Sequence, residues 1–267
     1  MNIDKIVFLC YYYSAINLIA RSFDKEAVMA HPQQFNKDRV YIDADDNVAA
    51  AFIASFNEAL DALLMGERIP QREGEQPRLK FFGGCCELQD VVHKCKTISE
   101  HEAIQQTLER VALREFMVET GHDSLKCFAL FQRIPLTHYV GPKKKMKGYF
   151  LGLLRSTSVP CATRIEASEM RLPVWIPVAN VLRGEHGGVK LIPQHQEAGI
   201  IAIATMLRLL EESIGADPNG EQLITAAFKA KRDALSLEVA YALGSRGLTS
   251  LEEYARLVSE EARQGIR

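Results

Sequence analysis

The most informative segment of this chain of 267 residues is Arg114-Glu115-Phe116-Met117-Val118-Glu119-Thr120-Gly121, near its middle. On a helix, Glu115 and Glu119 lie on the same face because four residues separate them. Their carboxylates are the hard oxygen ligands that Mg²⁺ and Mn²⁺ prefer. A cation held there neutralises the charge of a bound pyrophosphate and can activate a water for attack at phosphorus. The stretch is therefore a candidate for a divalent-cation site on one face of a helix. Taken alone, however, an Arg-Glu with a second glutamate four residues on is more often the solvated face of an amphipathic helix.

The bounds of that helix follow from its two ends. Ser99 and Glu102 have the spacing of a capping box, in which each side chain bonds the backbone of the other residue. Gly121 can adopt the left-handed conformation that typically ends a helix. We therefore expect one helix from near Glu100 to Thr120.

A glycine pair precedes this helix in the segment Gly83-Gly84-Cys85-Cys86-Glu87, which follows a short strand predicted at residues 79–82. Glycine lets the backbone approach a metal ion closely. In this order, residues 83–87 and 114–121 resemble the motif of the Nudix hydrolases. That motif is a glycine, a spaced glutamate, Arg-Glu, a hydrophobic residue, any residue, Glu-Glu, any residue and glycine.

The resemblance covers roughly residues 45–216 and implies a domain organisation. Leu63-Leu64 resembles the strand that feeds the motif, Trp175-Ile176-Pro177-Val178 the strand after it, and the helix from Gln196 the closing helix. The implied fold is α/β, a Nudix-type α/β/α sandwich with a mixed sheet. An N-terminal extension (1–44) precedes it, and a C-terminal helical segment (217–267) follows the turn-forming residues 217–220.

Residues 48–65 leave two alternatives open. Alanine and leucine dominate them, so helix propensity alone favours one amphipathic helix. The resemblance favours two strands joined around Asn57 and Asp61, and we expect the strands.

The resemblance also implies an activity, namely hydrolysis of a phosphoanhydride bond in a nucleoside diphosphate-linked substrate. Glu119 would be a ligand of Mg²⁺ or Mn²⁺, and Glu115 a ligand or the residue that positions the attacking water. Arg114 would pair with a carboxylate and orient the helix. Further candidate ligands near the motif are Gly84, Glu87, and Glu169 or Glu166.

Three basic residues are candidates for binding the substrate: Arg68, Lys145 and Lys147. The two lysines belong to a basic run at residues 143–147 between two predicted strands. Such a run could hold substrate phosphates, although lysine-rich turns are more often simply solvated.

The chain departs from the motif in three ways. Val118 stands where the first glutamate of the Glu-Glu pair is expected, and Gln106 stands eight residues before Arg114, where another glutamate is expected. The stretch between Gly84 and the helix is longer than usual by about five turns of helix. These departures keep a second function open, a catalytically impaired Nudix-like domain that binds a nucleotide in a regulatory role.

A second stretch superficially echoes the motif: Arg208-Leu209-Leu210-Glu211-Glu212-Ser213-Ile214-Gly215. It lacks the glutamate directly after its arginine, and its glutamate pair is one position out of register. We interpret it as the ordinary end of a helix.

Cysteine and histidine offer weaker signals. Cys85, Cys86, His93 and Cys95 lie close together in the sequence, but adjacent cysteines on a strand point to opposite faces, so buried thiols are favoured over a zinc site. The histidines at 122, 138, 186 and 195 show no pattern of a nucleophile relay.

Composition indicates a globular protein, with 47% hydrophobic and 25% charged residues and a formal net charge of −2. That charge does not suggest nucleic acid as a partner. Six cysteines without a CxxC pair are typical of reduced thiols, and the apolar residues 6–20 are too short to span a bilayer. We expect a cytoplasmic protein with no membrane partner. The terminal helices carry apolar faces and could form a homodimer interface.

Overall fold

The computed structural model describes residues 48–70, 73–93, 95–121, 127–140, 144–155, 170, 173–215 and 222–264. Several expectations fall outside these residues. They are the apolar element at 6–20, the domain boundaries at 44–45 and 216–217, the turn at 217–220, and the candidate ligands Glu166 and Glu169.

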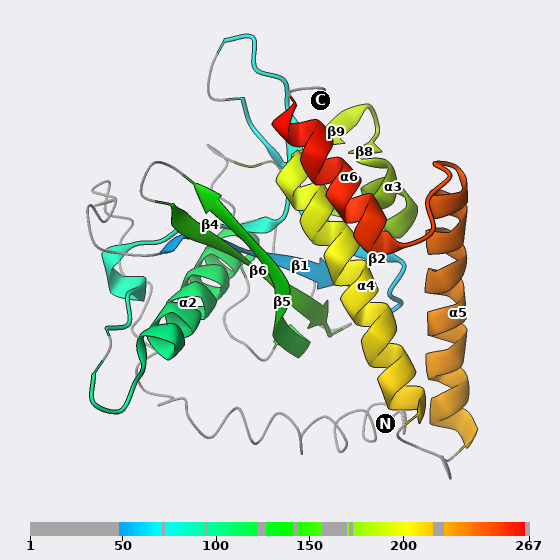
Figure 1. Cartoon of the computed structure of the whole chain (residues 1–267), viewed down its shortest axis with the longest axis horizontal. Coiled ribbons are helices and arrows are strands. Elements are labelled where there is room, and N and C mark those ends of the chain that lie inside the picture. The colour runs from blue at the N-terminus through cyan, green and yellow to red at the C-terminus, as the bar shows by residue number, and fades with distance from the viewer. Residues whose placement is uncertain are drawn as a thin grey trace.

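The described strands are β1 (Val48–Phe56), β2 (Ala62–Arg68), β3 (Arg78–Lys80), β4 (Phe82–Cys85), β5 (Phe128–Val140), β6 (Lys145–Leu154), β7 (Val174–Pro177), β8 (Glu185–His186) and β9 (Val189–Leu191). They form one mixed sheet in the order β5-β6-β1-β2-β3-β9-β8, with β4 also paired to β1 and β7 to β2 (Figure 1). Strand β1 runs parallel to β6, and β3 runs parallel to β9. The other pairs are antiparallel, so the mixed sheet is confirmed.

The described helices are η1 (Leu88–Asp90), α2 (Glu100–Thr120), α3 (Val178–Arg183), α4 (Pro193–Gly215), α5 (Gln222–Gly244) and α6 (Leu251–Arg263). In Figure 1, α6 lies along α4, and α5 stands beside α4. None of these helices is long and apolar enough to cross a membrane.

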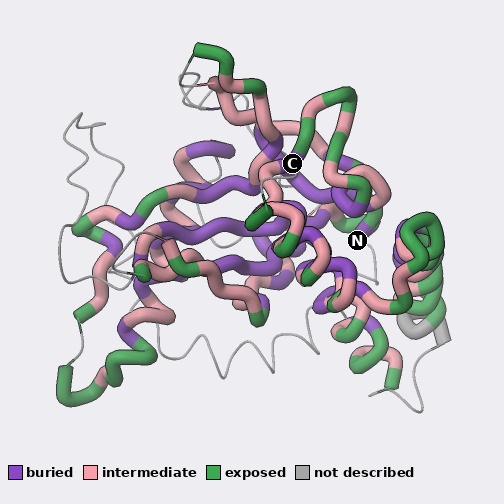
Figure 2. The backbone as a smooth tube through the Cα atoms, turned by 45° about the horizontal axis from the view of Figure 1, so that its top comes forward, coloured by how far each residue is buried: buried purple, intermediate pink, exposed green. Residues whose placement is uncertain are grey.

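Alternate residues of β1 face two separate hydrophobic cores. Ala51 and Ile53 are buried with side chains of α2, whereas Phe52 and Phe56 are buried with side chains of α4. The sheet therefore lies between helices on both faces, as Figure 2 shows by its buried central strands. This arrangement confirms the expected α/β/α sandwich.

Residues 48–65 form strands and not a helix. Strand β1 is buried on both faces along almost its whole length, which suits a continuous apolar run. Its turn into β2 is fixed by Asn57, whose Nδ2 donates to Asp61 Oδ1 at 2.6 Å. Burial between two helical layers therefore outweighs the helix propensity of the alanines and leucines.

Both ends of α2 agree with the sequence. Ser99 and Glu102 form the capping box, and Gly121 ends the helix in the left-handed region with a φ of 73°. One predicted strand, at residues 79–82, is instead divided into β3 and β4 around Phe81. The N–H of Phe81 bonds His195 Nδ1 at 3.2 Å, so this residue leaves the strand ladder to anchor α4.

The C-terminal helices add to the core beside α4. Leu235 and Val239 of α5 and Val258 of α6 are buried with it. Tyr254 of α6 is fully buried, and its hydroxyl donates to the carbonyl of Leu182. Part of the apolar surface of these helices is therefore covered within the chain.

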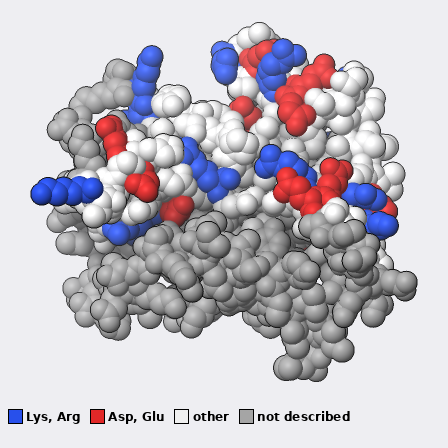
Figure 3. Space-filling model, turned by 60° about the horizontal axis from the view of Figure 1, so that its bottom comes forward, with Lys and Arg blue, Asp and Glu red and all other residues white. Residues whose placement is uncertain are grey.

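On the face in Figure 3, the described surface carries acidic and basic side chains side by side.

Candidate active site

The glycine pair lets α2 approach the sheet closely. Gly83 and Gly84 lie on β4 opposite Phe52 and Ala51 of β1. A Cβ on Gly84 would lie 2.5 Å from the carboxyl carbon of Glu115, and a Cβ on Gly83 would lie 2.2 Å from the carbonyl oxygen of Ala51. Gly83 also has a φ of 135°, which other residues rarely adopt. Both positions therefore require glycine if Glu115 is to rest against the β4 backbone.

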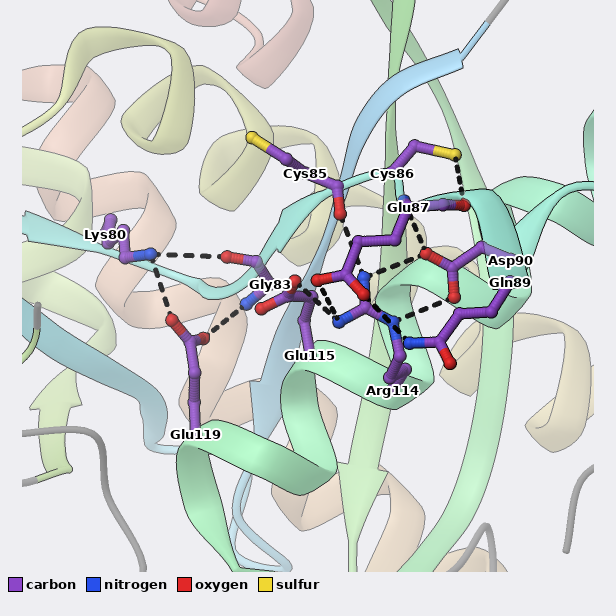
Figure 4. Close-up of polar contacts among 10 residues, drawn as sticks. All are labelled: Lys80, Gly83, Cys85, Cys86, Glu87, Gln89, Asp90, Arg114, Glu115 and Glu119. Atoms are coloured by element: carbon purple, nitrogen blue, oxygen red, sulfur yellow. Dashed lines mark hydrogen bonds and ion pairs between the residues drawn. The ribbon is translucent and has the colours of Figure 1, made fainter. Parts of the chain in front are cut away.

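Glu119 is bound by both carboxylate oxygens, one to β4 and the other to the lysine that ends β3 (Figure 4). Oε2 accepts a hydrogen bond from the N–H of Gly83 at 2.8 Å, and Oε1 lies 3.1 Å from Nζ of Lys80. Lys80 Nζ also donates to the carbonyl oxygen of Gly83 at 3.2 Å. The carboxylate is almost fully buried, and these bonds compensate for its desolvation.

Arg114 joins α2 to the loop that follows β4. Its Nε and Nη2 donate to the two carboxylate oxygens of Asp90, both at 2.8 Å, and Nη2 also donates to the carbonyl of Cys85 at 3.0 Å. Nη1 lies 2.9 Å from Glu115 Oε1 and 3.3 Å from Glu87 Oε1. Burial by itself would lower the pKa of Arg114. The hydrogen bonds to Asp90 and the negative charges of Glu115, Asp90 and Glu87 outweigh this effect and raise the pKa of Arg114 above its ordinary value. The guanidinium therefore orients both the helix and the loop.

Asp90 is the carboxylate partner of Arg114, and this role was not predicted from the sequence. The resemblance implied that Arg114 pairs with a carboxylate, but it did not say which one, and a motif glutamate is absent at Gln106. The arginine instead bonds Asp90, which is buried and also accepts the N–H of Glu87 at 2.8 Å.

The insertion between these points folds against α2. Leu88–Asp90 forms a single 3₁₀ turn, and Val92 N–H donates to Thr107 Oγ1 of α2 at 2.9 Å. Cys85 and Cys95 are exposed, whereas Cys86 is buried in the core beside α2. Buried-thiol packing is thus found for Cys86.

The site gathers four carboxylates and two cationic side chains: Glu87, Asp90, Glu115, Glu119, Lys80 and Arg114. Four negative and two positive charges leave a formal charge of −2, opposite to that of one divalent cation. Carboxylate oxygens together with the Gly83 carbonyl are donors that Mg²⁺ and Mn²⁺ prefer, so the chemistry of the donor set fits such an ion. Within the described ranges, no three His, Cys, Asp or Glu side chains already stand as a metal-binding group. Each carboxylate is instead bonded to Lys80 or Arg114.

The candidate substrate-binding residues lie on two strands. Lys147 of β6 is level with Ala50 of β1, which is in turn level with Cys85 of β4. Lys147 Nζ lies 3.4 Å from Gln194 Oε1, and burial lowers the pKa of Lys147. Lys145 lies two residues earlier, at the start of β6.

Arg68 lies at the end of β2. It forms an ion pair with Glu75 at 3.5 Å, in which its side chain is partly exposed. Among the described residues, no contact joins Arg68 to the carboxylates around Arg114. The structure therefore places Lys147 level with Cys85 of β4 across β1 and leaves Arg68 with a separate partner.

A histidine network on the α4 face was not foreseen. His138 contacts the Tyr149 hydroxyl through Nδ1 at 3.1 Å and Glu197 through Nε2 at 2.9 Å. His195 is buried, and burial, followed by nearby positive charges that include Lys80 and Lys147, holds the pKa of His195 well below its usual value. A neutral His195 can accept the Phe81 N–H, so these residues fasten α4 to the sheet beside β4.

Comparisons with known proteins find likeness only among solved structures. No protein-family model matches the chain, and no curated protein matches it. A Nudix hydrolase from Alicyclobacillus acidocaldarius is 16% identical with a TM-score of 0.42, covering 60% of this chain and 93% of that one. The MutT protein from Methanosarcina mazei Go1 is 13% identical with a TM-score of 0.37, covering 61% of this chain and 97% of that one. The Nudix domain of Shewanella oneidensis NrtR, solved with ADP ribose, is 12% identical with a TM-score of 0.39, covering 71% and 97%.

Two of the three are named as Nudix proteins, the group whose motif residues 83–87 and 114–121 resemble. Likenesses this distant carry no argument about the activity, metal or substrate of this chain. Its function has to be argued from the geometry of the site itself.

Proposed function

We propose that the chain is a Nudix-type hydrolase that cleaves a phosphoanhydride bond in a nucleoside diphosphate-linked substrate with Mg²⁺ or Mn²⁺. One observation carries the proposal. Arg114 binds Asp90 and the Cys85 carbonyl at the same time, and this holds Glu115 and Glu119 of α2 against the glycine backbone of β4. An ordinary exposed helix face would need neither the glycine pair nor a largely buried arginine.

The residues that would hold the cation are Glu119, Glu115 and the backbone of Gly83-Gly84. The cation supplies charge neutralisation at the pyrophosphate and a more acidic water when it is bound. Glu115 lies beside Arg114, where its carboxylate can orient a water or accept a proton from it. Lys147 and Lys145 are the candidate cations for the substrate phosphates, with Arg68 a more remote third.

Two observations favour a second function, nucleotide binding without cleavage. Val118 supplies no oxygen to the site, and Oε1 of Glu119 is already paired with Lys80. A domain with a weakened cation site could still recognise a nucleotide.

The test is hydrolysis of a panel of nucleoside diphosphate derivatives with Mg²⁺ or Mn²⁺, measured for wild type, Glu119→Gln and Glu109→Gln. Glu109 lies on the same helix, but its carboxylate bonds Gln105 at 2.9 Å, so Glu109→Gln is a matched control. We expect turnover that Glu119→Gln abolishes and Glu109→Gln retains. Nucleotide binding without turnover of any substrate by the wild type would establish the second function instead.

A further inference from the structure

Lys80 occupies a position where a divalent cation would be expected. Its ammonium lies between Glu119 Oε1 at 3.1 Å and the carbonyl oxygen of Gly83 at 3.2 Å. Both are oxygens of the proposed cation site, one anionic and one from the backbone. The side chain of Lys80 is only 13% exposed, so this ammonium is held inside the site and does not extend into solvent.

The local fold explains why this lysine reaches the site. Lys80 ends β3, where it pairs with Gly66 of β2, and the chain then turns at Phe81 into β4. This turn brings Gly83, only three residues later, back beside the Lys80 side chain. The position of the ammonium is therefore set by the same turn that presents the glycine pair to α2.

The pairing also places a positive charge beside the almost fully buried carboxylate of Glu119. A carboxylate without a partner there would be strongly disfavoured, and Lys80 supplies the compensating charge. A divalent cation that bound Glu119 would supply the same compensation. The ammonium and the divalent cation therefore compete for the same two oxygens, and their charges repel each other.

We propose that Lys80 is an internal competitor of the divalent cation: it holds Glu119 and the Gly83 carbonyl when the cation is absent, and it must withdraw when the cation binds. This inference rests on the proposed function, since it assumes that the cation binds at Glu119. It makes Lys80 a positioning residue that sets the affinity for metal.

The experiment is a titration of wild type, Lys80→Met and Lys147→Met with Mn²⁺ and no nucleotide, following free Mn²⁺ by electron paramagnetic resonance. Lys147→Met removes the same charge nearby, but Lys147 bonds Gln194 and none of the four carboxylates. Losing a charge-assisted competitor should tighten Mn²⁺ binding of Lys80→Met by about tenfold. Lys147→Met should change the dissociation constant by less than about threefold, because Lys147 bonds Gln194 and competes for no oxygen of the proposed cation site.

Mn²⁺ binding by Lys80→Met that is equal to or weaker than that of the wild type would overturn the inference. Metal-dependent turnover by the wild type would then show that the proposed function still holds without it. Tighter binding that Glu119→Gln abolishes would support both. If no variant bound Mn²⁺ in a way that depends on Glu119, the inference and the cation-dependent function would both be wrong.

A measurement on the wild type guards against misfolding of Lys80→Met. Acetic anhydride acetylates exposed lysine amines, and mass spectrometry resolves the rate at each lysine. Saturating Mg²⁺ should raise the acetylation rate of Lys80 several-fold relative to Lys147, because the ammonium leaves its two acceptors. An unchanged ratio under conditions where Mg²⁺ binds would contradict the proposed withdrawal.

Discussion

The ends of α2 and α4 carry similar sequences in very different surroundings. Residues 114–121 and 208–215 each hold an arginine, glutamates and a final glycine. Arg114 is largely buried and bonds Asp90, whereas Arg208 pairs with Glu212 at 3.7 Å, and both of those side chains are 63% exposed. Glu211 and Glu212 are exposed as well. The two segments therefore differ in their surroundings more than in their sequences. Residues 114–121 pack against the glycines of β4 and bond a buried carboxylate, whereas the charged residues of 208–215 are exposed.

The largest difference is expected between the two arginines. Arg114→Ala leaves Asp90, Glu87 and Glu115 without their shared cation, so we expect the free energy of unfolding to fall by about 3–5 kcal/mol. Arg208→Ala should change it by no more than about 0.5 kcal/mol, because exposed ion pairs contribute little. Urea denaturation of both variants measures this. Equal losses would remove the distinction between the two helix ends.

The glycines provide a second contrast. A methyl group on Gly84 would meet the carboxylate of Glu115 at 2.5–2.9 Å, whereas nothing lies within 4 Å of a methyl group on Gly215. We expect Gly84→Ala to lower the free energy of unfolding by about 1–3 kcal/mol and to displace Glu115. Gly215→Ala should be close to neutral. A neutral Gly84→Ala in thermal denaturation would mean that α2 does not rest on β4 as described.

The pH dependence of stability distinguishes the start of α4 from its end. The pKa of His195 is depressed in the folded protein. The contribution of neutral His195 to the free energy of unfolding is therefore fully present above the pKa of the unfolded chain, about 6.5. Below that value the unfolded chain takes up the proton first, so stability should fall by about 1.4 kcal/mol per pH unit towards the depressed pKa.

His195→Asn should remove this slope, since an amide oxygen can accept the Phe81 N–H without titrating. The measurement is urea denaturation between pH 7.5 and 5. His101→Gln, a change at an exposed histidine, is the control. If the slope persisted in His195→Asn and disappeared in His101→Gln, the pH dependence would come from His101 and not from His195.

The smallest expected effect compares single hydroxyl groups of the two helices. Ser99 caps α2 by accepting the Glu102 N–H, so Ser99→Ala should cost about 1 kcal/mol of stability. Ser213 bonds the Leu209 carbonyl within α4, and Ser213→Ala should change stability by less than about 0.5 kcal/mol. Differential scanning calorimetry resolves the two, and the reverse order would contradict this view of the cap.

The sequence was sufficient for the parts of the fold that local chemistry decides. Ser99 and Gly121 gave the bounds of α2 because a capping box and a left-handed glycine are local signals. For β1 and β2 the local signal favoured a helix, and only the resemblance to the Nudix motif led to strands. Burial between two helical layers is not visible in a window of eighteen residues.

The site was harder to predict because its bonds join distant parts of the chain. Arg114 was expected to orient α2 by pairing with a carboxylate. Its partner Asp90 lies 24 residues earlier in the chain, within the insertion, so the pair could not be identified from local spacing. The contact of Lys80 with Glu119 spans 39 residues, and that of Phe81 with His195 spans 114. A lysine or histidine in a strand or helix gives no sequence signal of such a partner.

The most direct test compares both helix ends in one assay of Mg²⁺-dependent hydrolysis on the best substrate of the panel. The double variant Glu115→Gln/Glu119→Gln removes the carboxylates of α2, and Glu211→Gln/Glu212→Gln makes the same change at the exposed end of α4. We predict that the first loses at least about a hundredfold in kcat/KM, while the second stays within about twofold of wild type. Equal activity in the two double variants would contradict the assignment of the site to α2 and β4.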